Sequence, residues 1–171
     1  MYLDFLSQAD VVKAISISIT LAFIVSIVVA YKNCRNNPSV FIAAAVLAAN
    51  FVIANNAVYE MLGFGPKQDL DFYLRWVEYN SLTIIAIIVI HLLTNIKHHK
   101  ITVFSMYLLQ INIIAYIAMH VDIIVKGNRE PWILWQIYTP VVNVTEISIA
   151  MLIIAYSINY LRKDKTEKEG M

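Results

Sequence analysis

Five long apolar runs, separated by short polar segments, set the pattern of this chain. A helix needs roughly 20 mostly apolar residues to cross a bilayer core of about 30 Å. Each run reaches that length, so the pattern predicts five transmembrane helices, at about 11–31, 39–59, 73–96, 101–125 and 132–160. Because the connecting segments are short, we expect helices that follow one another in sequence to pack as antiparallel neighbours.

Composition supports the membrane class. Of the 171 residues 60% are hydrophobic and 15% are charged, whereas soluble domains have about 25% charged residues. The expected fold is an all-α integral membrane bundle over 1–161, followed by a charged tail, 162–171. A net charge of +1 gives no basic field for nucleic acid. Cys34 is the single cysteine, which excludes an internal disulfide; no metal or cofactor is expected.

Basic residues predict the orientation, because cytoplasmic loops carry an excess of Lys and Arg. One side of the predicted bundle has Lys32, Arg35, Lys97, Lys100, Arg162, Lys163, Lys165 and Lys168. The other side has Lys13, Lys67, Arg75, Lys126 and Arg129. The first side is expected to be cytoplasmic, with the N-terminus outside, and the membrane to be a bacterial cytoplasmic (inner) membrane. The acidic start MYLDFLSQAD does not resemble a cleavable signal peptide.

Polar residues within the runs fall into two layers when depth is taken from the rise of about 1.5 Å per residue. The outer layer contains Asn55, Asn56, Glu60, Arg75, Glu78, His120, Asp122 and Gln136. The central layer contains Thr20, Asn50, Thr83, Asn112 and Glu146. Ionisable groups at this depth are costly and usually face the interior of a bundle or a wet cavity. Glu146 is therefore the strongest candidate for a functional group.

These layers predict two sets of site residues. The first is an ion or proton path made of Glu146, Glu78, Asn112, Asn143 and Asn50. The second is an outer polar cluster made of Arg75, Glu60, His120, Gln136 and Asn56. The competing interpretation is structural: membrane asparagines often join helices by hydrogen bonds, and Arg75 and Glu78 can extend to the membrane interface. His98 and His99 lie in a short loop and are expected to be solvated.

Helical spacing indicates which side chains share a face. In the last run Gln136, Thr139, Asn143, Glu146, Ala150 and Ser157 follow a three-four spacing. In the fourth run Asn112, Tyr116 and His120 form a similar stripe. Ala44 and Ala48 have the spacing of small residues that lets a neighbouring helix approach closely. Pro140 removes one backbone hydrogen bond and is expected to bend the last helix or release a carbonyl group.

The stretch Arg75-Trp76-Val77-Glu78-Tyr79 resembles helix C of microbial rhodopsins, and its sequence is most similar to that of heliorhodopsins. In that family the glutamate is the counterion of a protonated retinal Schiff base, with the arginine nearby. Rhodopsins have seven helices and a retinal-linking lysine in the seventh, which five runs do not provide. The resemblance therefore implies only that Glu78 is a buried, partnered carboxylate, and retinal is not expected.

Three hypotheses for function follow. The first is that the chain conducts or binds protons, small cations or a small ligand, within the bundle or at an oligomer interface. The second is a non-catalytic accessory or assembly subunit of a larger membrane complex. The third is an intramembrane lipid-modifying enzyme, which ranks lowest because HExxH, GxSxG and glycine-rich phosphate motifs are absent from the sequence. The expected partners are the lipid bilayer and either further copies or other membrane subunits.

Overall fold

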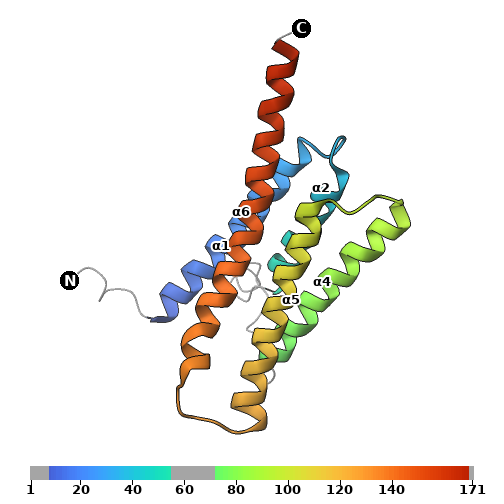
Figure 1. The fold of residues 1–171 in the computed structure, drawn as a ribbon. Coiled ribbons are helices and arrows are strands. Elements are labelled where there is room, and N and C mark those ends of the chain that lie inside the picture. The colour runs from blue at the N-terminus through green and yellow to red at the C-terminus, as the bar shows by residue number, and fades with distance from the viewer. Residues whose placement is uncertain (1–7, 55–71, 170–171) are drawn as a thin grey trace, which may run out of the picture.

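The computed structural model describes residues 8–54 and 72–169, and this part of the chain is helical throughout apart from short connections. The helices are α1 (Gln8–Tyr31), α2 (Pro38–Ala54), α4 (Phe72–Thr94), α5 (Lys100–His120) and α6 (Ile133–Glu169). A short π-helical segment, η2 (Val121–Val125), continues α5. Figure 1 shows them as a bundle of roughly parallel rods, with α6 rising beyond the rest.

Four of these helices are long and apolar enough to cross a membrane: Ala14–Tyr31, Phe72–Thr94, Lys100–Val125 and Ile133–Lys163. Helices of this length and hydropathy indicate an integral membrane protein in contact with lipid. The predicted spans agree with them to within a few residues. Helix α2 is apolar but has 17 described residues, and the rest of its predicted span, 55–59, lies outside the described residues.

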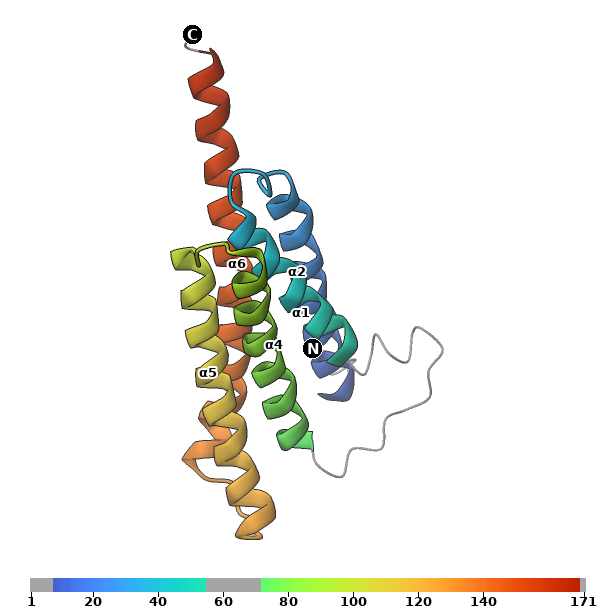
Figure 2. The same ribbon diagram turned by 90° about the vertical axis from the view of Figure 1, so that its right-hand side faces the viewer.

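The helices form a closed ring in the order α1, α2, α4, α5, α6 and back to α1, with α2 also touching α5 and α6. Consecutive helices are antiparallel neighbours, as the short connections predicted, and the ring closes through the parallel pair α1 and α6 (Figure 2). We call the end where α1 and α4 finish and α2 and α5 begin the tail end. The opposite end, where α5 passes through η2 toward α6, is the turn end.

Small side chains let α2 pack closely against the other helices near the tail end. Ala43, Ala44, Leu47 and Ala48 are all buried. The predicted close approach at Ala44 and Ala48 therefore agrees with their complete burial. The outer surfaces of α4, α5 and α6 are instead covered by exposed Leu and Ile side chains, as expected where lipid replaces water.

The connection between α4 and α5 is set by two local features. Asn95 adopts a left-handed conformation, with φ of 53°, and the Ile96 N–H donates to the His91 carbonyl, the pattern that commonly ends a helix. His99 then caps α5, because its Nδ1 accepts a hydrogen bond from the Ile101 N–H. The polypeptide thus turns sharply, which brings α5 back beside α4.

Helix α6 is longer than its predicted span. It continues to Glu169 through most of the charged tail. At about 1.5 Å per residue its 37 residues extend over roughly 55 Å. The last turns therefore project beyond the ring at the tail end (Figure 1). Pro140 lies inside this helix.

Candidate functional site

At the tail end, a buried serine joins three parts of the ring. Ser39 Oγ lies 2.8 Å from His91 Nε2 and 2.9 Å from Thr102 Oγ1, and it accepts the backbone N–H of His99 at 2.8 Å. His91 Nδ1 lies 2.7 Å from the Ile87 carbonyl oxygen, so that nitrogen donates. We call Ser39, His91, His99 and Thr102 the serine hub. It connects the starts of α2 and α5 to the end of α4.

The Ser39–His91 contact has the distance of a nucleophile and its general base, but its surroundings favour a structural role. Ser39 is 4% exposed and His91 is 1% exposed, and each side-chain polar atom of Ser39, His91 and Thr102 has a hydrogen-bond partner. The ring of His98 stacks on His91 at 4.2 Å, and that of His99 lies 4.6 Å from Tyr156. Further rings therefore cover both histidines of the hub.

The two loop histidines differ from one another. His98 is exposed, as the sequence predicted, but His99 is half-buried and holds the start of α5. Burial, followed by the nearby His91 charge, lowers the pKa of His98 below its ordinary 6.5. Burial, followed by Lys100, lowers the pKa of His99 in the same way. Both rings therefore favour the neutral form in the folded protein.

Next to the serine hub, on the side toward the turn end, lies a layer of completely buried apolar side chains, which we call the apolar layer. All its members are 0% exposed: Phe23, Leu47, Ile87, Leu109, Ile149 and Ile153. They come from all five helices and belong to one packed core. This layer separates the tail end from the polar groups nearer the membrane centre.

The central layer follows directly beyond the apolar layer. Asn50, Asn80 and Asn112 stand 11, 11 and 10 residues from Ser39, His91 and Thr102, whose side chains meet in the hub. At about 1.5 Å per residue the three amides therefore lie at one depth, roughly 16 Å from the hub. The Thr145 hydroxyl donates to Asn112 Oδ1, which places the neighbouring Glu146 at the same level. The predicted members of this layer are all buried: Thr20, Asn50, Thr83, Asn112 and Glu146.

A pocket of about 280 Å³ opens between the central layer and the turn end, and all five helices contribute to its wall. Helix α1 supplies Ile15, Ser16 and Ile19, and helix α6 supplies Tyr138, Thr139, Val142, Asn143 and Glu146. The remaining wall is aromatic, with Phe51 from α2, Phe72 and Trp76 from α4, and Tyr116 from α5. We call this space the aromatic pocket.

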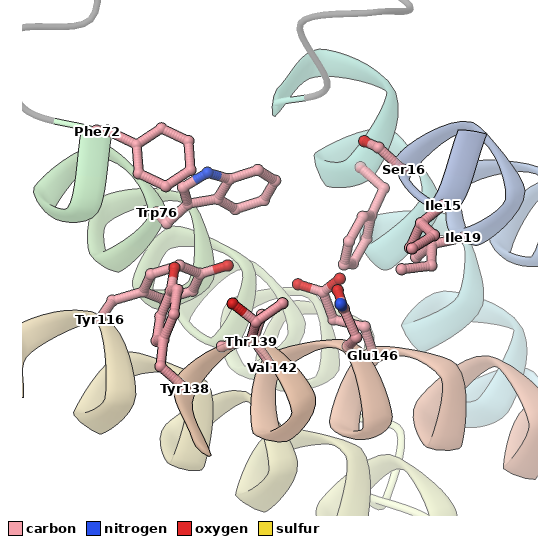
Figure 3. A pocket seen from close by; sticks show the side chains of 12 residues that line it. Ile15, Ser16, Ile19, Phe72, Trp76, Tyr116, Tyr138, Thr139, Val142 and Glu146 are labelled. Carbon is pink, nitrogen blue, oxygen red and sulfur yellow. The ribbon is translucent and has the colours of Figure 1, made fainter. Parts of the chain in front are cut away.

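Ring contacts fix the aromatic side of this pocket. Trp76 stacks parallel to Tyr116, with ring centres 5.8 Å apart. Tyr138 meets Tyr116 edge to face at 5.7 Å, and Phe72 meets Trp76 edge to face at 6.4 Å. Figure 3 shows these four rings at one side of the pocket and Glu146 farther along α6, facing Ile19 of α1. The rings hold one another in place, so the wall is preformed.

Glu146 is the single ionisable carboxyl group in the pocket wall. It is 5% exposed, and within the described ranges no side chain or backbone N–H donates a hydrogen bond to it. A buried carboxylate without a partner is costly. Its position is therefore explained poorly by packing alone, and a cation in the pocket would supply the partner that the protein does not.

At the turn end, η2 directs Asp122 into the protein. The wider π-helical turn ends with the Lys126 N–H donating to the Val121 carbonyl oxygen at 2.9 Å. Asp122 Oδ2 accepts the indole N–H groups of Trp132 and Trp135, each at 2.8 Å, and the Asn128 amide at 3.1 Å. These hydrogen bonds join the end of α5 to the start of α6, and they provide the Asp122 carboxylate with donors from the protein itself.

The structure brings together part of the predicted ion or proton path. Glu146 and Asn143 line the pocket, and Asn50 and Asn112 lie at the same depth. Glu78 is exposed on α4 and does not line the pocket, although the rhodopsin resemblance implied a buried carboxylate. It starts a stripe of exposed residues, including Leu82 and Ile85, because its side of α4 points away from the ring.

The predicted outer polar cluster is only partly described. Asn56 and Glu60 lie outside the described residues. Gln136 is exposed, His120 and Arg75 are half-buried, and no hydrogen bond joins His120 to Gln136 in the described part of the chain. Asp122 instead organises this end, through tryptophans that the sequence pattern did not assign to it. The helix changes from α to π geometry after His120, and this change sets the direction of the Asp122 side chain. The hydrophobic pattern of the sequence does not show such a change.

Sequence reasoning also missed the serine hub and the aromatic wall. The burial of His91 had a signal, because Asn80, Ile87 and His91 share one helical face. Tyr116 was expected in a helical stripe, but its gathering with Trp76 and Tyr138 depends on how the helices are rotated against one another. Comparisons of the chain with protein-family models, curated proteins and solved structures gave no match.

Proposed function

We propose that this membrane protein binds a small molecule in the aromatic pocket, with Glu146 as the anchor. The observation that carries the proposal is the Glu146 carboxyl group, which has no hydrogen-bond partner among the described residues and lies in a preformed, mostly apolar pocket. Ligand sites commonly combine such walls with one or two convergent polar groups. With the orientation predicted from the basic residues, the pocket faces the outer side of a cytoplasmic membrane.

Binding accounts for the geometry better than conduction through one copy. An ion that reached Glu146 from the turn end would next meet the apolar layer, whose six side chains are completely buried. An ion loses its hydration in such a layer and gains no ligand there, so the barrier is high. The pocket therefore resembles a blind cavity, and conduction would require either a rearrangement of this layer or a path between copies.

A fluorescence experiment tests this proposal. The chain has three tryptophans, and Trp76 lines the pocket, so a ligand-dependent change in emission that Trp76→Phe removes is assigned to Trp76. In lipid nanodiscs, a ligand of the pocket should change the Trp76 emission saturably. We expect Val142→Phe, which fills the pocket, to abolish the change in emission. Val144 is 62% exposed on α6, and Val144→Phe should preserve the change.

Three probes with one phenyl ring and different head groups suit this titration: 3-phenylpropylamine, 3-phenylpropanol and 4-phenylbutanoate. A change that persists in Val142→Phe would reflect partition into the bilayer. Failure of all three probes to give a pocket-dependent signal would reject the proposal.

A subunit role is the second candidate, and the exposure of Glu78 favours it. This residue lies within the span Phe72–Thr94, about 9 Å from its start, where a carboxyl group facing lipid is costly. A second copy or another membrane subunit that covered this side of α4 would remove the cost. Purification in mild detergent tests this role, since a stable monodisperse monomer would count against it.

A further inference from the structure

We infer that the ligand of the aromatic pocket is an organic cation: a free amine whose ammonium group lies beside Glu146 and whose flat apolar body extends toward Tyr138 and Trp76. This inference rests on the proposed function and names the chemical class of ligand. Among the described residues that line the pocket there is one acidic side chain and no Lys, Arg or His. A ligand of the opposite charge is the one that this wall attracts.

The rings near Glu146 favour the same class. Phe51 follows Asn50 by one residue, so it lies at nearly the same depth as Glu146, and both line the pocket. The Phe51 ring stacks on Phe23 at 4.2 Å and lies 6.3 Å from Trp76, which holds it in position. Aromatic faces attract ammonium groups through their negative potential, most strongly where water is excluded. A carboxylate next to such rings is a favourable site for an ammonium group.

The same wall disfavours a metal ion. Calcium takes six to eight oxygen ligands, and magnesium keeps an octahedral shell. Within residues 8–54 and 72–169 no group of three or more His, Cys, Asp or Glu side chains is placed to hold a metal. Six of the twelve lining residues carry hydrocarbon or indole side chains, which cannot replace the water that a small ion would lose. An organic cation brings its own apolar surface and meets both parts of the wall.

Size and length limit the ligand further. The volume of about 280 Å³ lies just below the usual range for drug-sized ligands, about 300–1,000 Å³. Tyr138 and Glu146 are eight residues apart on α6, or about 12 Å along the axis. The ligand is therefore a small amine with one ring or a short chain. A lipid ammonium head group fits less well, because its phosphate would find no basic side chain among the described residues of this wall.

The three phenyl probes test the charge preference, because they differ chiefly in the head group. The amine is an ammonium ion at neutral pH, as the lysine side chain is. We expect 3-phenylpropylamine to bind about 10- to 100-fold more tightly than 3-phenylpropanol, the usual effect of a hydrogen bond to a charged group. The carboxylate probe should bind more weakly than both.

Glu146→Gln and Glu130→Gln form a matched pair of variants, since Glu130 is exposed in the loop before α6. Glu146→Gln should remove the preference for the amine while the alcohol still binds, which also shows that the pocket remains folded. Glu130→Gln should keep the preference. Equal binding of amine and alcohol, or a preference that survives Glu146→Gln, would overturn the inference and leave the proposed pocket standing. Binding of no probe would instead reject the pocket itself.

The lipid composition separates a free amine from a lipid head group. The titration is repeated in nanodiscs of phosphatidylglycerol and of phosphatidylglycerol mixed with phosphatidylethanolamine. An affinity for 3-phenylpropylamine that is the same in both supports a free amine. A loss of at least tenfold in the mixed discs would assign the site to the lipid ammonium group and overturn the free amine.

Discussion

The tail half and the turn half of the bundle use the same five helices in opposite ways. In the tail half, the alanines of α2 are buried, the apolar layer is completely buried, and the side-chain polar atoms of Ser39, His91 and Thr102 all have partners. In the turn half, large aromatic rings pack against one another and leave a pocket in which no described residue donates a hydrogen bond to Glu146. The first arrangement favours stability, and the second leaves a buried carboxyl group for which the proposed ligand would be the partner.

Truncation in the apolar layer should give the largest effect. Leu109→Ala removes a completely buried side chain and leaves a cavity, so we expect the free energy of unfolding to fall by about 2–4 kcal/mol. Ile114→Ala, at a 67% exposed position on the same helix, should change it by less than about 0.5 kcal/mol. Unfolding by sodium dodecyl sulfate in mixed micelles measures both. Equal losses for the two variants would show that the tail half is not the tightly packed one.

The serine hub should give the next largest effect. His91→Phe keeps a ring but leaves Ser39 without one of its partners, and we expect a loss of about 1–3 kcal/mol. The hydrogen exchange of the first turns of α2 should rise in the same variant, because Ser39 begins that helix. His98→Phe changes an exposed ring and serves as the control. If His91→Phe is as stable as this control, the serine hub does not contribute to the stability of the tail half.

A pH effect on the tail end should be the smallest. The pKa values of His98 and His99 are lowered from 6.5 in the folded protein, so between the lowered and the ordinary values the unfolded chain binds more protons. The stability is then fully present above about pH 6.5 and declines as the pH falls through that value.

Thermal unfolding at pH 7.5 and pH 5.5 measures this decline. The double variant His98→Gln and His99→Asn should flatten it, while the asparagine still caps α5. If the double variant loses the same stability between pH 7.5 and pH 5.5, titrating groups other than His98 and His99 cause the loss. A midpoint that rises on acidification would contradict the sign.

The layers show how far sequence reasoning reaches. The depth of Glu146 and Asn112 follows from counting residues along a helix, so their shared layer could be predicted and their burial is confirmed. The face of α6 was predicted only in part: Asn143 and Glu146 turn inward, but Gln136 is exposed. Position along a helix is a property of one segment, whereas the direction of a side chain depends on how that segment is rotated against its neighbours.

The sequence by itself determined the membrane class, the approximate limits of the four long apolar helices and the shared layer of the central polar groups, because the length and hydropathy of a run are local properties that the bilayer selects. Only the tertiary structure decided which of these groups meet. Ser39 and His99 are 60 residues apart, and their hydrogen bond requires three helices to converge. Trp76, Tyr116 and Tyr138 form one wall because α4, α5 and α6 present them to the same space. That Glu146 has no donor among the described residues has the same reason: its neighbours in space, and not its neighbours in sequence, determine its partners.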